Sequence, residues 1–226
     1  MGDRPILFSA PMVRALLAGT KTQTRRIIKP RRHCSLFDGT WSDSYVLDPG
    51  NAEWRERELA YHVGDRLWVR EGHALLPRTA YRMSIGTGTI AQREHPTDGY
   101  TAAVFREGFD RSGRPRWRPS IHMPRWASRL TLTVTDVRVE RLQDISEADA
   151  GAEGVKTWVA ALAGDPKVSV ADVEAMISRT GEGSMRAGYA ALWEAINGPG
   201  TWEANPWVAA YTFTVEHRNI DAGDVE

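Results

Sequence analysis

The sequence lacks several features that would assign it to particular structural classes. It has one cysteine among 226 residues, Cys34, so an internal disulfide framework is excluded and a reducing compartment is expected. It has no apolar run near the ~18–20 residues that a membrane-spanning helix needs. Its N-terminal segment also lacks the pattern of a secretory signal. We therefore expect a cytoplasmic protein with no membrane partner.

The sequence also lacks an excess of charge of either sign. Lys plus Arg and Asp plus Glu are both 29, which argues against the tight non-specific nucleic-acid binding that rests on counterion release. Basic residues nevertheless gather in two stretches, over 21–32 and 111–129, so RNA stays open as a partner. The six histidines show no metal-ligand spacing. We expect no cofactor, and the sequence predicts no particular oligomeric state.

Hydrophobic residues make up 42% of the chain and charged residues 26%, which is typical of globular domains with a proper core. Capping residues and apolar periodicity predict helices after Ser9, after Ser146, over 170–179 and over 184–196. Alternation predicts strands over 66–70, 128–142 and 207–216, and shorter strands near 80–85 and 100–105. The alternation changes phase near Asp136, which indicates a β-bulge.

The fold class that these elements indicate is α+β. We predict a small curved mixed β-sheet or barrel, flanked by helices and interrupted by long loop insertions. A single domain over 1–220 would carry insertions near 31–60, 72–122 and 157–183. We expect the acidic end, 221–226, to be a disordered tail.

Residues 19–26, G-T-K-T-Q-T-R-R, are the most informative segment. Lys21 and Thr24 would point to opposite faces of a regular strand, so only a turn or bulge brings them together. A lysine beside a threonine hydroxyl is a plausible base and nucleophile for a hydrolase. A Thr- and Arg-rich stretch is also typical of plain polar surface, so this segment alone leaves both interpretations open.

Three separated segments together carry a family resemblance. Residues 19–26 resemble the G-x-K-T-x-T-x-R entry of ASCH domains, which belong to the PUA-like superfamily. Residues 64–71, G-D-R-L-W-V-R-E, resemble the Gly-Asp turn and strand of that family, and 142–154 resemble its segment from strand to helix. The long insertions and the opening P-I-L-F-S-A-P-M-V-R-A are similar to longer forms found in phage and prophage.

The resemblance implies an N4-acetylcytidine amidohydrolase that acts on small N4-acylated cytosine nucleosides with a Lys, Thr and Glu triad. Carried over by position, Thr24 attacks the acyl carbonyl, Lys21 takes its proton, and Glu153 protonates the departing amine. Glu71 is a competing candidate for the acidic member. Backbone N–H groups of the 20–24 turn are candidates for an oxyanion hole.

Substrate-binding candidates are Arg26, Glu71 and two tryptophans, Trp68 and Trp126, which could stack on the pyrimidine or belong to the core. The loop over 117–126 carries Trp117 and Met123, and we expect its apolar face to receive acyl groups larger than acetyl.

A rival interpretation is an RNA-binding module or ribonuclease of the PUA-like superfamily, with the basic stretches 29–32 and 111–129 on phosphates. A phage accessory protein without catalysis is a third.

Overall fold

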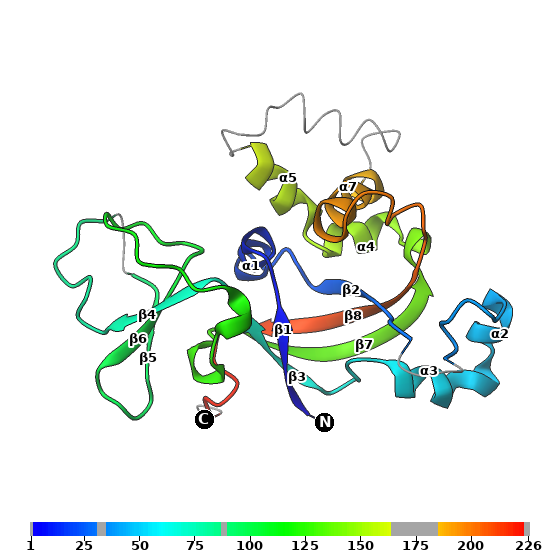
Figure 1. Cartoon of the computed structure of the whole chain (residues 1–226), viewed down its shortest axis with the longest axis horizontal. Helices are drawn as coiled ribbons and strands as arrows, with labels where there is room; N and C mark the ends of the chain where they lie inside the picture. Colours follow the sequence, from blue (N-terminus) through cyan, green and yellow to red (C-terminus); the bar gives the residue numbers. More distant parts are fainter. Residues whose placement is uncertain (1, 31–34, 87–89, 164–184, 224–226) are drawn as a thin grey trace.

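The structure, a computed structural model, describes residues 2–30, 35–86, 90–163 and 185–223. A five-stranded mixed sheet lies at its centre, in the order β1-β3-β7-β8-β2 (Figure 1). Its strands are β1 Asp3–Leu7, β2 Gln23–Ile27, β3 Arg66–Arg70, β7 Thr131–Arg141 and β8 Trp207–Glu216. The three strands predicted most clearly from alternation, β3, β7 and β8, are confirmed.

The sheet is curved but open. β1 runs parallel to β3, and every other neighbouring pair is antiparallel. The register of β7 against β8 shifts between Val134 and Asp136, which confirms the predicted bulge. Among the described strands β1 and β2 are the two edges, so the sheet alternative of the prediction is confirmed and the closed barrel is not.

Four helices cover one face of the sheet (Figure 1). They are α1 Ala10–Leu17, α4 Glu147–Ala152, α5 Val155–Ala163 and α7 Met185–Asn197. The Ser146 hydroxyl caps α4 by accepting from the Asp149 N–H at 3.1 Å, as predicted. The helix predicted over 184–196 is confirmed as α7, whereas the one predicted over 170–179 lies outside the described residues.

The predicted insertion over 72–122 folds into a second, smaller sheet. Strands β4 His73–Pro77, β5 Gln92–Glu94 and β6 Thr101–Phe105 pair antiparallel in the order β4-β6-β5. The strand predicted near 100–105 is confirmed. The strand predicted near 80–85 is wrong, because these residues form successive turns in which the Ala80 N–H donates to Pro77 O. A separate small core of Ala103, Phe105, Met123 and Ala127 stabilises this sheet.

The predicted insertion over 31–60 is more regular than expected. Within its described part it forms two short helices, α2 Asp43–Leu47 and α3 Ala52–Glu58. The Ser42 hydroxyl caps α2, and Val46 and Leu59 are buried in the main core. Buried apolar anchors thus order a segment whose charge and turn residues predict irregular structure.

The C-terminal segment still contacts the rest of the fold at Asp221, the first residue of the predicted tail. Ile220 is buried, and the Asp221 carboxylate accepts hydrogen bonds from Arg125 at 2.6–3.0 Å. The rest of the predicted tail, 224–226, lies outside the described residues. In the part of the chain that the structure describes, no helix has the length and apolarity to cross a membrane.

Candidate active site

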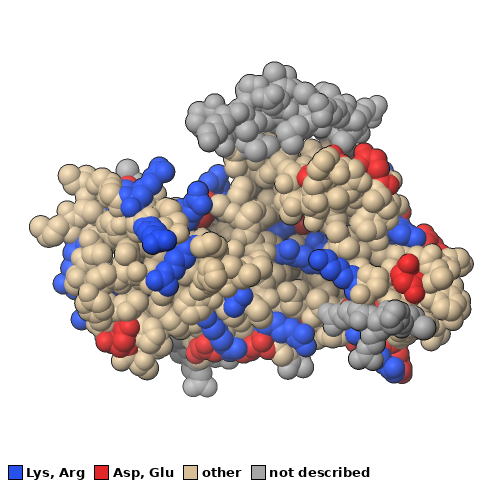
Figure 2. All heavy atoms as spheres, viewed as in Figure 1, with Lys and Arg blue, Asp and Glu red and all other residues tan. Residues whose placement is uncertain are grey.

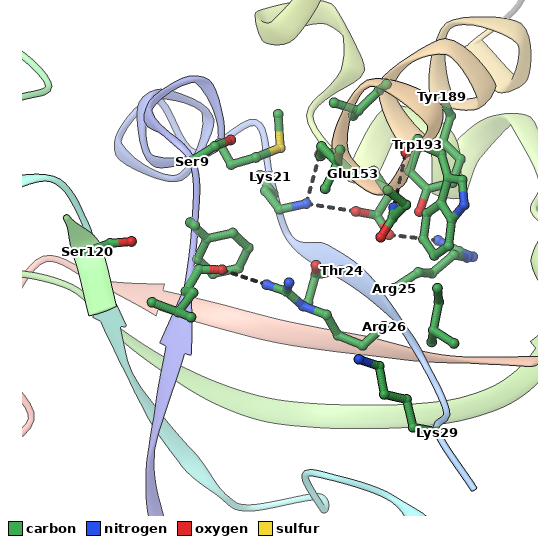
Figure 3. Close-up of a pocket in the computed structure, with 17 residues that line it drawn as sticks. Ser9, Lys21, Thr24, Arg25, Arg26, Lys29, Ser120, Glu153, Tyr189 and Trp193 are labelled. Carbon is green, nitrogen blue, oxygen red and sulfur yellow. Dashed lines mark hydrogen bonds and ion pairs between the residues drawn. The ribbon is translucent and has the colours of Figure 1, made fainter. Parts of the chain in front are cut away.

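A pocket of about 680 Å³ occupies the opening between the two edges of the sheet. The end of β1 and the start of α1 supply one wall, β2 supplies another, and α7 covers the pocket with an apolar wall (Figure 3). The two edges are bridged at one point, where Arg26 Nη2 donates to Leu7 O at 2.7 Å. The residues of the sequence motif that line this pocket are Lys21, Thr24, Arg25 and Arg26.

Lys21 enters the pocket from the turn between α1 and β2. Gly19 ends α1 with a φ of 68°, a conformation that glycine adopts without strain. The N–H groups of Thr20 and Lys21 then both donate to Ala15 O, at 2.9 and 3.2 Å. This tight turn directs the Lys21 side chain inward, where it is only 1% exposed. Lys21 lies in the connection before β2, and it lines the same pocket as Thr24.

The Lys21 ammonium is bound twice by one residue. Its Nζ donates to Glu153 Oε2 at 2.7 Å and to the Glu153 carbonyl at 2.9 Å. Glu153 ends α4, and Gly154 follows with a φ of 85°. A Cβ atom at Gly154 would lie 2.9 Å from Ala15 Cβ and 3.3 Å from Lys21 Cβ. The glycine therefore lets α4 approach the α1–β2 turn closely enough to form the pair.

Burial and neighbouring charge act on this pair in opposite directions. Burial lowers the pKa of Lys21, Glu153 opposes that shift, and Arg26 and Arg25 lower the pKa further. Burial disfavours a charged amine, and nearby positive charges add to the effect. The site thus makes Lys21 easier to deprotonate than an ordinary lysine, with an acceptor for its proton 2.7 Å away.

Thr24 presents its hydroxyl to the same pocket. Figure 3 shows it on the side of β2 where the Lys21 ammonium lies. The side chain is 5% exposed, and no described residue makes a hydrogen bond to its hydroxyl. A hydroxyl with no competing partner is free to meet a bound substrate.

Arg25 fixes the carboxylate from the other side. Its Nη1 donates to Glu153 Oε1 at 3.2 Å, and its guanidinium also contacts Glu140 and Asp149. Burial, the Glu153 charge and a hydrogen bond to that carboxylate raise the pKa of Tyr189 well above its ordinary value, so its hydroxyl is a donor. The contacts of Arg25 and Tyr189 with Glu153 were not predicted from the sequence. The position of Tyr189 on the apolar face of α7 was the only available signal.

The free edge of β2 also offers backbone donors. Phe213 N donates to Thr22 O and Ile28 N to Trp207 O, so even-numbered residues of β2 are the hydrogen-bonded partners of β8. In an antiparallel pair the alternate residues point their N–H and C=O groups away from the partner. Arg25 and Ile27 therefore turn these groups toward the open edge, and both line the pocket.

Three of the predicted oxyanion donors in 20–24 are already used inside the fold. The N–H groups of Thr20 and Lys21 are used by Ala15 O, and that of Thr22 by Ala152 O at 2.9 Å. Donors already committed inside the fold cannot stabilise an oxyanion. The Arg25 N–H on the open edge replaces them as the candidate.

Three predicted binding residues lie outside this pocket. Glu71 is buried and receives two hydrogen bonds from Arg129, both 2.8 Å long, in a neighbouring hollow. Trp68 is buried on β3 under the Arg70 guanidinium, and Trp126 packs on the small core and against the His95 ring. The pocket lining includes neither tryptophan. Neither side chain is therefore placed to stack on a pyrimidine bound in this pocket.

Three of the six arginines in the second basic stretch have acidic partners. Arg111 pairs with Asp110, Arg129 with Glu71, and Arg125 with Asp3 and Asp221. Arginines already bound to carboxylates are poor phosphate ligands, so these three residues give the RNA interpretation little support. Part of the first stretch, 31–34, lies outside the described residues.

Among the residues that the structure describes, no group of three or more His, Cys, Asp or Glu side chains is placed to hold a metal ion. Comparisons of the chain with protein-family models, with curated proteins and with solved structures returned no match.

Proposed function

We propose that the chain is an amidohydrolase of the ASCH type, in the PUA-like superfamily, that cleaves the N4-acyl amide of N4-acylated cytosine nucleosides. One observation carries the proposal. Lys21, Thr24 and Glu153, which lie up to 132 residues apart, line one pocket, and the first and last are in direct contact at 2.7 Å. A hydroxyl beside a buried amine–carboxylate pair suits acyl transfer.

The acylation half of the reaction starts when the proton between Lys21 Nζ and Glu153 Oε2 moves to the carboxylate, which leaves a neutral amine. Thr24 Oγ attacks the acyl carbonyl, and its proton passes to the neutral Lys21 amine. The Arg25 N–H on the open edge of β2 stabilises the oxyanion that forms. The C–N4 bond then breaks as Glu153 gives its proton to N4, which leaves an ester on Thr24 and frees cytidine.

The deacylation half restores the starting state. The ionised Glu153 takes a proton from a water molecule, whose oxygen attacks the ester carbonyl. The C–O bond to Thr24 breaks, and the Lys21 ammonium returns a proton to the threonine oxygen. The carboxylic acid departs with Lys21 neutral and Glu153 protonated again, so neither half needs a cofactor.

The apolar wall that we propose for the acyl group belongs mainly to α7. The predicted position was the 117–126 loop. Of the 117–126 loop, Trp117 lines the neighbouring hollow and Met123 is buried in the small core. The wall of the candidate pocket consists of apolar α7 and α1 side chains, namely Leu192, Trp193, Ile196 and Met12. The expectation of acyl groups larger than acetyl rests on this wall.

We predict that kcat/KM rises from acetyl to butanoyl derivatives. Each buried methylene contributes ~0.8 kcal/mol, which is about fourfold in rate. Ile196→Ser should reduce this preference, whereas Ile121→Ser should not. The two isoleucines are matched in exposure, at 56% and 58%, and only Ile196 lines the pocket. A preference confined to acetyl, or equally reduced in both variants, would remove the acyl group from this wall.

The two candidate carboxylates offer a direct test of the assignment. Glu153→Gln and Glu71→Gln each remove a buried charge from an ion pair, with Lys21 and Arg129 respectively, and both should lower stability by roughly 3–5 kcal/mol. Hydrolysis of N4-acetylcytidine, measured per folded molecule, should fall at least about 100-fold in Glu153→Gln alone.

Thermal unfolding supplies the folded fraction in each preparation. Loss of turnover in folded Glu71→Gln, with Glu153→Gln still active, would transfer the acid–base role to Glu71.

A further inference from the structure

A second hollow, of about 360 Å³, adjoins the candidate active site. Phe8, Ser9 and Ser120 line both spaces, so the two are neighbours across the turn between β1 and α1. The outer wall of the hollow comes from residues just before β4 and just after β6, and from 117–120. A substrate bound with its amide at Thr24 can therefore extend toward this hollow.

The charge of this hollow is positive once its ion pairs are counted. Its two carboxylates are both neutralised, Glu71 by Arg129 and Glu107 by Arg14 at 2.8 and 3.1 Å. Arg106 and Arg118 also line the hollow. Both are exposed, and over the described part of the chain no carboxylate lies within ion-pair distance of either. Two guanidinium groups are thus left without a counterion.

The surroundings add to this charge. On the face drawn in Figure 2, basic side chains gather over the lobe of the smaller sheet and across the middle of the molecule, with acidic ones mainly toward its margins. Lys29 and Arg26 line the adjoining pocket. A guanidinium presents its N–H donors in a planar fork that matches phosphate oxygens.

From this arrangement we infer that the hollow is a subsite for a phosphate group joined to the nucleoside. The inference rests on the proposed function and names its substrate class more closely, as N4-acylcytidine nucleotides. A terminal phosphate and the phosphodiester of a strand share this chemistry. Arg106 and Arg118 bind the phosphate, while Lys21, Thr24 and Glu153 act on the amide.

The test compares kcat/KM for N4-acetylcytidine, its 5′-monophosphate, and a short single-stranded oligonucleotide with one internal N4-acetylcytidine. The intact chain should favour the phosphorylated substrates about tenfold or more over the nucleoside at low salt. Arg106→Gln and Arg118→Gln should each reduce that ratio several-fold, and the double variant should bring it near one. Arg82→Gln is the control, because Arg82 is an exposed arginine of the same lobe outside the hollow.

A binding measurement separates failure of this inference from failure of the proposed function. Cytidine 5′-monophosphate should bind more tightly than cytidine by a similar factor, and the arginine variants should remove the difference whether or not any amide is cleaved. Equal binding of the two ligands, or a ratio unchanged in Arg106→Gln and Arg118→Gln, would overturn the subsite. A preference for the oligonucleotide over the monophosphate identifies the phosphodiester as the source.

Discussion

We expect Thr24→Val to abolish the hydrolysis of N4-acetylcytidine and to leave the fold intact. We expect kcat/KM to fall by at least about 1,000-fold, because a valine methyl group cannot form the ester intermediate. The stability should stay equal or rise slightly. The Thr24 hydroxyl is almost buried and has no hydrogen-bond partner within the described residues, so replacing it with an apolar group removes a desolvation cost.

The matched control is Thr22→Val, two residues earlier in the same motif. Thr22 is exposed and lies outside the pocket, so its variant should keep nearly full activity. Steady-state rates with both variants, alongside thermal unfolding, check the prediction. An undiminished rate in folded Thr24→Val would eliminate the covalent mechanism, whatever the effect at Thr22.

Lys21 should be as necessary as Thr24, and its charge alone should not suffice. Lys21→Arg keeps the positive charge but supplies a group that does not deprotonate in a protein. Lys21→Met keeps much of the buried apolar stem and removes the amine. Both variants should lose at least about 100-fold in kcat/KM, the usual contribution of a positioned base.

The pH profile supplies a second readout for Lys21. Since burial and the neighbouring arginines lower the pKa of Lys21, the wild-type kcat/KM should rise with pH through that pKa. Below it the amine keeps its proton and cannot accept one from Thr24. Substantial turnover in folded Lys21→Arg would reduce Lys21 to a source of charge.

Three strands of the main sheet, β3, β7 and β8, were predicted because their signal is local. Alternation along 66–70 and 207–216 depends only on which face of a strand is buried, and the phase change at Asp136 marks a bulge within one strand. Residues 80–85 show the limit of such signals. β-Branched and aromatic residues alone predict a strand there, but no strand among the described residues pairs with them.

Part of the candidate site was predicted, but from a family resemblance and not from local periodicity. Lys21, Thr24 and Glu153 were placed by resemblance to a family, and the fold brings all three to one pocket. The pocket itself depends on the order of strands, which leaves β2 at an edge with Arg25 N–H facing outward. Periodicity within a segment does not contain that order, nor the position of Tyr189 beside Glu153.

The prediction that Trp68 and Trp126 stack on the pyrimidine rested on residue type alone. Trp68 and Trp126 serve packing, the commoner role of large aromatic side chains. The wall above the pocket comes instead from α7. The apolar face of this helix can be recognised in the sequence, but tertiary packing decides which pocket it covers.

The central claim, hydrolysis of an N4-acyl amide, is tested most directly by identifying the products. Purified wild-type chain and Thr24→Val, prepared identically, are incubated with N4-acetylcytidine and N4-butanoylcytidine, and both products are quantified. The wild type should release cytidine and the carboxylic acid in equal amounts, and Thr24→Val should release neither. No cytidine from the wild type, or equal release by the two proteins, would contradict the account.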